Sequence, residues 1–162
     1  MNIFLGLISL TMMLVSGSGV SAKSASMNKA EMSNAITLLR SAYAAFNQGD
    51  IDAAVSAFDP NIDWVEPSEF PGGGAYEGRE GAKQYLTQSR ARCEQVISEP
   101  VKFIPAGARI VVFVHARVLP KGSNQWQEID LADVYTFSGG KPVSMHAFAR
   151  REDALKWAGV KQ

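Results

Sequence analysis

The chain has 162 residues, of which 46% are hydrophobic and 20% charged, and its 16 Lys and Arg residues balance 16 Asp and Glu residues. That length suits a single domain with a core of its own, and the composition excludes disordered and fibrous proteins. Because net charge is absent, the sequence also argues against a nucleic-acid-binding protein and against electrostatic attraction to a membrane surface.

The first 22 residues differ in character from the rest. Residues 3–15 are almost wholly apolar, and no charged side chain precedes Lys23. This run is too short to span a bilayer, which takes about 20 residues. Small residues follow up to Ala22, so we predict a signal peptide over residues 1–22 and an exported domain, periplasmic or secreted, over residues 23–162. The alternatives are a buried N-terminal helix and an uncleaved anchor, because no Lys or Arg opens the segment.

Three helices are expected in the first part of the domain. An apolar stripe with steps of three and four predicts a helix from residue 27 to about residue 49, and Asp50 is suited to cap a second helix that continues to Phe58. Residues 61–66 alternate and predict a short strand. Residues 67–78, rich in Pro and Gly, predict a loop, and a third helix is expected over residues 79–93.

After Val96 the hydrophobic period changes to two. This pattern predicts strands over residues 97–104, 109–119, 125–137 and 142–149, with hairpin turns between the last three and a short helix over residues 152–157. Helices followed by a meander of strands indicate an α+β fold, in which N-terminal helices wrap a cone-shaped, curved antiparallel sheet. The apolar interior of such a cone is suited to a small, largely apolar ligand.

Two carboxylates are predicted to face this interior. Asp133 stands in the middle of the apolar face of strand 125–137, where an ionised and unpaired carboxylate would be costly. Glu66 shares a strand face with Trp64, and a carboxyl beside an indole in an apolar cleft is expected to have a raised pKa, suited to a general base. The alternatives are a solvated loop carboxylate for Glu66 and a structural salt bridge with Arg117 for Asp133.

Strand 109–119 is apolar on both faces, so its orientation stays open. If Phe113 points inward, His115 and Arg117 point inward too, although a histidine there is more often a satisfied core residue than a catalyst. Tyr43 is expected to pack in the stripe of the first helix with its hydroxyl near the rim. The residues expected to contact a ligand are Trp64, Tyr43, Tyr85, Phe113, Leu131, Tyr135 and Met145.

Four segments, residues 44–52, 64–67, 132–137 and 140–148, resemble the nuclear-transport-factor-2-like superfamily, in particular its SnoaL-like and ketosteroid-isomerase-like branches. In the isomerases, an acidic residue before a proline moves a proton between carbons, and Glu66 occupies that position. A second, protonated Asp donates a hydrogen bond to the oxyanion, and Asp133 occupies that position. The match places Ala42 where the isomerases have a Tyr, and leaves Tyr43 one residue away.

The resemblance implies an exported small-molecule-binding domain, and an isomerase, cyclase or dehydratase if it is an enzyme. Glu66 would be the general base, and Asp133, with His115 or Arg117, would stabilise or reprotonate an enolate-like intermediate. An Arg117 beside Asp133 would hold that carboxylate ionised, which departs from the isomerases and resembles the cyclases, dehydratases and epoxide hydrolases of the superfamily. The alternative is a non-catalytic ligand-binding or dimerisation module of the same fold.

The remaining predictions concern partners. We expect no cofactor, and no metal because the only histidines are His115 and His146. Cys93 is the only cysteine, so no disulfide within the chain is expected. We expect no nucleic acid, and a homodimer that forms through the outer face of the sheet. Candidates for that interface are Val112, Val114, Val134 and Phe148.

Overall fold

The computed structural model describes residues 26–161. The predicted signal peptide and its cleavage site after Ala22 lie outside the described residues, so export stays a prediction. Within the described part, no helix has the length and apolar character needed to cross a membrane.

Capping residues mark where the N-terminal helices begin and end. Helix α1 (Lys29–Gln48) starts with a capping box, in which the side chain of Asn28 and the side chain of Glu31 each accept a hydrogen bond from the other's backbone N–H. It ends at Gly49, whose φ of 83° is left-handed and favours glycine. Asp50 caps α2 (Ile51–Val55), which is shorter than predicted, and α3 spans Gly78–Ala91.

Six strands form one curved sheet in the order β2-β1-β6-β5-β4-β3. The later strands confirm the predicted meander, while the sheet as a whole is mixed because β1 pairs with β6 in parallel. Strand β2 was predicted as loop. The strand bounds are β1 Asp63–Glu66, β2 Gly74–Glu77, β3 Cys93–Ala106, β4 Arg109–Pro120, β5 Gln127–Ser138 and β6 Lys141–Phe148.

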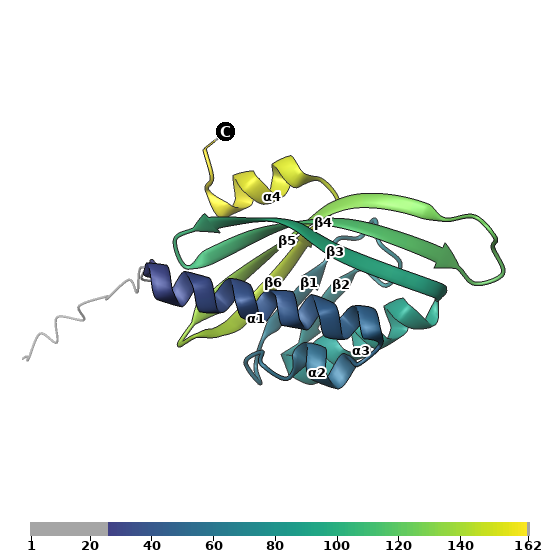
Figure 1. Cartoon of the computed structure of the whole chain (residues 1–162), viewed down its shortest axis with the longest axis horizontal. Helices are drawn as coiled ribbons and strands as arrows, with labels where there is room; N and C mark the ends of the chain where they lie inside the picture. Colours follow the sequence, from purple (N-terminus) through teal and green to yellow (C-terminus); the bar gives the residue numbers. More distant parts are fainter. Residues whose placement is uncertain (1–25, 162) are drawn as a thin grey trace, which may run out of the picture.

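Helices lie on both sides of the sheet (Figure 1). Helices α1 to α3 lie on one side, which we call the inner face, and α4 (Arg151–Ala158) lies on the other, the outer face. The main core fills the space between the inner face and the N-terminal helices, with Leu39 and Ile62 fully buried. A second cluster joins Val111 and Val134 of the sheet to Ala154 of α4. Strand β4 is therefore apolar on both faces because each face is covered.

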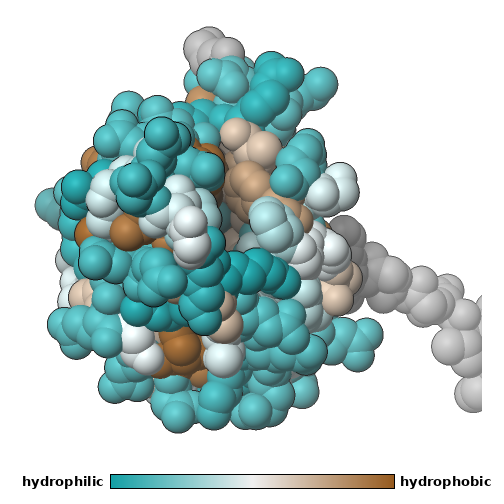
Figure 2. Space-filling view, turned by 90° about the vertical axis from the view of Figure 1, so that its right-hand side faces the viewer, coloured by the Kyte–Doolittle hydropathy of each residue, from teal (hydrophilic) through white to brown (hydrophobic). Residues whose placement is uncertain are grey.

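The surface agrees with a domain that buries its apolar side chains. Figure 2 shows one end of the molecule, where hydrophilic residues dominate and hydrophobic residues appear only as small separate patches. Among the described residues, the exposed large hydrophobic side chains are Val101, Trp126 and Trp157. The fold thus confirms the predicted α+β class, in which a curved sheet is wrapped by N-terminal helices.

Candidate functional site

A cavity of about 370 Å³ lies between the inner face of the sheet and the N-terminal helices. Its size falls in the range of small-molecule sites. Most lining side chains are apolar or aromatic, and Phe58 and Trp64 stack with ring centroids 5.9 Å apart. Three charged residues also line it, namely Glu66 of β1, Asp133 of β5 and Arg92, which lies between α3 and β3.

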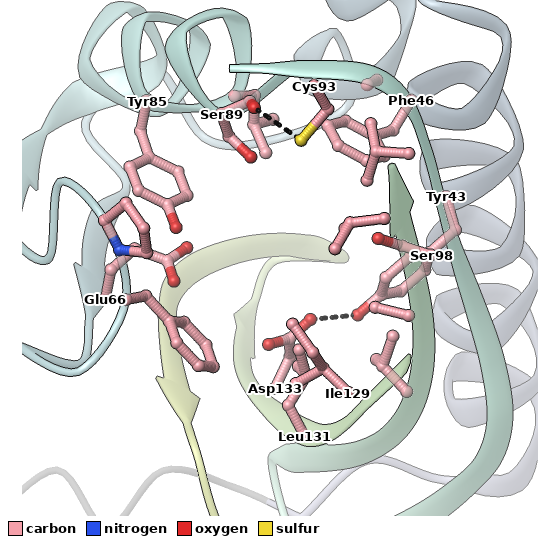
Figure 3. A pocket seen from close by; sticks show the side chains of 18 of the residues that line it. Tyr43, Phe46, Glu66, Tyr85, Ser89, Cys93, Ser98, Ile129, Leu131 and Asp133 are labelled. Carbon is pink, nitrogen blue, oxygen red and sulfur yellow. Dashed lines mark hydrogen bonds between the residues drawn. The ribbon is translucent and has the colours of Figure 1, made fainter. Parts of the chain in front are cut away.

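Glu66 ends β1 and points into the cavity (Figure 3). It is 7% exposed, and its Oε1 accepts a hydrogen bond of 2.8 Å from the indole Nε1 of Trp64. Burial, with a smaller contribution from the charge of Asp133, raises the pKa of Glu66 to about 8, although interactions with Trp64 and Tyr85 act in the opposite direction. This carboxyl is therefore largely protonated at neutral pH.

Asp133 faces the same cavity from β5 and is half-buried. The hydroxyl of Tyr43 on α1 donates a hydrogen bond to Oδ2 of this carboxylate (Figure 3). Burial raises the pKa of Asp133 to about 6, against the lowering effect of the Tyr43 hydrogen bond. The ring of Tyr135 meets the ring of Tyr43 edge-on at 6.5 Å, and burial together with the Asp133 charge raises the pKa of both phenols.

The two carboxyls act as one titrating pair because the charge on Asp133 raises the pKa of Glu66. At a pH between the two pKa values, the two carboxyls together hold one proton. The hydrogen bond from Tyr43 stabilises the charge on Asp133, and that charge in turn favours the protonated form of Glu66. This distribution is opposite to the one implied by the isomerase resemblance, in which the residue at the position of Asp133 is the protonated one.

Five of the seven predicted ligand-contact residues line the cavity: Trp64, Tyr43, Tyr85, Leu131 and Tyr135. Met145 is buried in the main core and is not one of the lining residues that the structure describes. Phe113 is on the outer face, where the guanidinium of Arg151 lies 4.9 Å from its ring centroid. The predicted contact of Phe113 with a ligand in this cavity is therefore wrong, and a contact of Met145 stays a prediction.

His115 and Arg117 also lie on the outer face, which settles the orientation that the sequence left open, and their candidate role as partners of Asp133 is wrong. Nδ1 of His115 is 2.9 Å from Oδ1 of Asp130, and the guanidinium of Arg117 lies 5.9 Å from the ring of Trp126. Alternation along β4 explains the error, because Val112 and Val114 point inward and the odd positions point outward.

Three of the four residues expected to form a dimer interface are buried in the described structure. Val112 and Val114 belong to the main core on the inner face. Val134 is fully buried in the cluster that α4 covers, and Phe148 packs against Trp157 of that helix. A homodimer stays a prediction, but Val112, Val114 and Val134 cannot form its interface.

Sequence reasoning missed the contact between Tyr43 and Asp133. The isomerase match pointed to Ala42, but the long tyrosine side chain reaches the carboxylate from the next position of α1. It also missed the polar group of the cavity wall, which includes Arg92, Ser89 and Ser98. No sequence signal identified them: Ser89 is in the last turn of α3, Arg92 follows that helix, and Ser98 lies within β3. Among residues 26–161, no three His, Cys, Asp or Glu side chains gather as metal ligands do.

Comparison with known proteins gives one family match. The model of the SnoaL-like domain matches residues 39–145, which is most of the described chain. No match was found among curated proteins.

Solved structures share the fold. An NTF2-like protein of unknown function from Burkholderia pseudomallei is 21% identical, with a TM-score of 0.66 over 76% of this chain and 95% of that one. A protein from Catenulispora acidiphila with a ketosteroid isomerase-like fold, in complex with trimethylamine, is 18% identical, with a TM-score of 0.63 over 76% and 93%. The epoxide hydrolase/cyclase-like enzyme SalBIII, with a role in pyran ring formation in the polyether salinomycin, is 24% identical, with a TM-score of 0.61 over 72% and 91%.

Proposed function

This chain belongs to the SnoaL-like domain family, and on that premise we propose that it binds a small, largely apolar organic molecule and moves a proton on it. The observation that carries the proposal is a pair of carboxyls, Glu66 and Asp133, with raised pKa values on the wall of one apolar cavity. Such a pair is suited to general acid–base chemistry near neutral pH. The reaction class is isomerisation, cyclisation or dehydration, and the residues that carry it need no cofactor.

The hydrogen bond from Tyr43 to Asp133, which stabilises the ionised carboxylate, supports a division of roles. Ionised Asp133 removes a proton from a carbon next to a carbonyl, and the electrons of the broken C–H bond form an enolate. Protonated Glu66 donates a hydrogen bond or its proton to the enolate oxygen. Tyr43 orients Asp133 and spreads its charge, and Trp64 orients Glu66. This assignment exchanges the roles that the sequence resemblance implied for the two carboxyls.

The similarity to SalBIII supports the enzymatic version, since that protein is described as an epoxide hydrolase/cyclase-like enzyme. At 24% identity the likeness extends to the fold, and the chemistry comes from the cavity of this chain. Export of the domain, predicted from residues 1–22, would place the substrate outside the cytoplasm.

Hydrogen–deuterium exchange on an enolisable ketone tests the proposal. The protein is incubated with 2-tetralone in D2O, and NMR follows both exchange at the carbon next to the carbonyl and binding-induced shifts. We expect exchange above the buffer background, and a loss of about 100-fold or more in Asp133→Asn and in Glu66→Gln. Asp130→Asn is the matched control, because it makes the same change on the outer face of the same strand.

Each outcome decides between the two functions. Exchange that survives Asp133→Asn and Glu66→Gln contradicts the acid–base pair. Shifts at cavity residues without exchange contradict the enzyme and support a ligand-binding domain. Exchange that falls in both cavity variants and persists in Asp130→Asn supports the proposed reaction.

A further inference from the structure

One charged residue of the cavity wall is not used by the proposed acid–base pair. Arg92 joins the C-terminal end of α3 to β3, and it lines the cavity together with Phe70 and Pro71 of the loop before β2. It is exposed, whereas Glu66 is 7% exposed. Arg92 therefore marks the end of the cavity that opens to solvent, and the carboxyl pair marks the interior.

The loop holds the guanidinium in place. Nη1 of Arg92 donates a hydrogen bond of 2.8 Å to the carbonyl oxygen of Pro71. A Cβ at Gly72 would lie 2.9 Å from Nη2, so the absence of a side chain there leaves room for the guanidinium. Gly72 also has a φ of 81°, which favours glycine. The loop therefore binds the guanidinium through one backbone carbonyl and leaves space for it beside Gly72.

Most of the hydrogen-bonding capacity of Arg92 is left over. A guanidinium has five N–H donors, and one hydrogen bond to the loop is formed. No carboxylate among residues 26–161 forms an ion pair with Arg92. Among the lining residues that the structure describes, it is also the only Lys or Arg. The guanidinium of Arg92 therefore lies at the cavity mouth with free N–H donors, which are suited to bind a carboxylate.

We propose that Arg92 forms an anion subsite and that the ligand is amphipathic, with a carboxylate at one end and an enolisable carbonyl at the other. This inference rests on the proposed function. The interior pair carries one negative charge when it shares one proton, so a ligand carboxylate is repelled there and attracted to Arg92. The charges thus fix which end of the ligand enters first, and the carbonyl reaches Glu66 and Asp133.

Two probes of the same shape test the subsite separately from catalysis. Biphenyl-4-carboxylate and biphenyl-4-carboxamide differ in charge but hardly in size, and calorimetry at pH 7 and low salt gives both Kd values. We expect the carboxylate to bind about tenfold more tightly. Arg92→Gln should bring the two Kd values together, and Arg92→Lys should keep part of the preference. Arg150→Gln removes the same charge from an exposed position beside α4 and should leave the preference intact.

Other results would overturn the subsite. Equal binding of both probes to the wild type overturns it but leaves the proposed function in place, because the cavity then still takes an apolar ligand. If Arg92→Gln weakens both probes to the same extent, Arg92 only holds the loop, and the inference is again wrong. If neither probe binds, the subsite and the ligand-binding part of the proposed function both fail.

Discussion

The hydroxyl of Tyr43 on α1 donates a hydrogen bond to the carboxyl of Asp133 on β5, although 90 positions separate the two residues in the chain. The contact joins the first helix to the sheet at the wall of the cavity. It also stabilises the charged form of Asp133 in a site where burial favours the neutral form. The helix thus sets the protonation of a carboxyl on a distant strand.

Tyr43→Phe should raise the pKa of Asp133. The variant removes the hydrogen bond that lowers this pKa and leaves the ring in place. We expect a rise of about one unit above the wild-type value, since a hydrogen bond to a charged group is worth about 1.5–3 kcal/mol and one unit about 1.4 kcal/mol. Carbon-detected NMR of the side-chain carboxyls measures the pKa directly. Tyr76→Phe is the control, because the hydroxyl of Tyr76 bonds the backbone of Gly72 instead.

Glu66→Gln should remove a pH dependence of stability. Burial raises the pKa of Glu66 from 4.5 to about 8, so the folded protein binds a proton more tightly than the unfolded chain between those values. The free energy of unfolding therefore falls as the pH rises through this window, by about 3 kcal/mol between pH 5 and pH 8. Urea titrations at several pH values should show this fall in the wild type and a flatter profile in the variant.

Glu69→Gln is the matched control for that experiment. Glu69 is exposed in the loop after β1, where its side chain accepts a hydrogen bond from Ser68. Its replacement should leave the pH profile of the wild type unchanged. A pH profile that is equally steep in the wild type and in Glu66→Gln would show that Glu66 ionises without cost.

Asp133→Asn should stabilise the protein at neutral pH. The carboxyl is desolvated and no cation contacts it in the described chain, so the amide removes a charge that the fold disfavours. We expect a gain of about 1 kcal/mol in the free energy of unfolding at pH 7. Arg117→Gln should leave the pKa of Asp133 unchanged, because Arg117 lies on the outer face. A loss of several kcal/mol in Asp133→Asn would instead indicate a buried ion pair.

The alternation of apolar and polar residues along a strand identified Asp133 as an inward carboxylate. It gave no orientation for β4, because both faces of that strand are apolar. Strand β5 has Asp133 among inward apolar residues and charged residues on part of its outer face, so its orientation was readable. Strand β4 carries Val111 on one face and Val112 on the other, since α4 covers the outer side. The sequence showed a helix after the last strand, but no local pattern indicates which face such a helix covers. For this reason the sequence did not show that His115 and Arg117 point outward.

Two other details depend on contacts that no local pattern encodes. Strand β2 is short and mostly exposed, and it is defined by backbone pairing with β1, so its residues looked like loop. The pairing of Tyr43 with Asp133 depends on how far α1 lies from the sheet. That separation is set by the whole core, which includes Leu39 and Ile62.

His146→Gln should remove a contribution that destabilises the protein in mild acid. His146 lies on the outer face with its ring stacked on Trp157 of α4 at 4.6 Å, and burial, followed by the charge of Arg109, lowers its pKa. The unfolded chain therefore binds a proton at this residue more readily, so the contribution of His146 to stability is lost as the pH falls below about 6.5. Urea titrations at pH 7 and pH 5 should show that the free energy of unfolding at pH 5, relative to its value at pH 7, is higher in the variant than in the wild type. An equal change in the free energy of unfolding between pH 7 and pH 5 in His146→Gln and in the wild type would contradict this prediction.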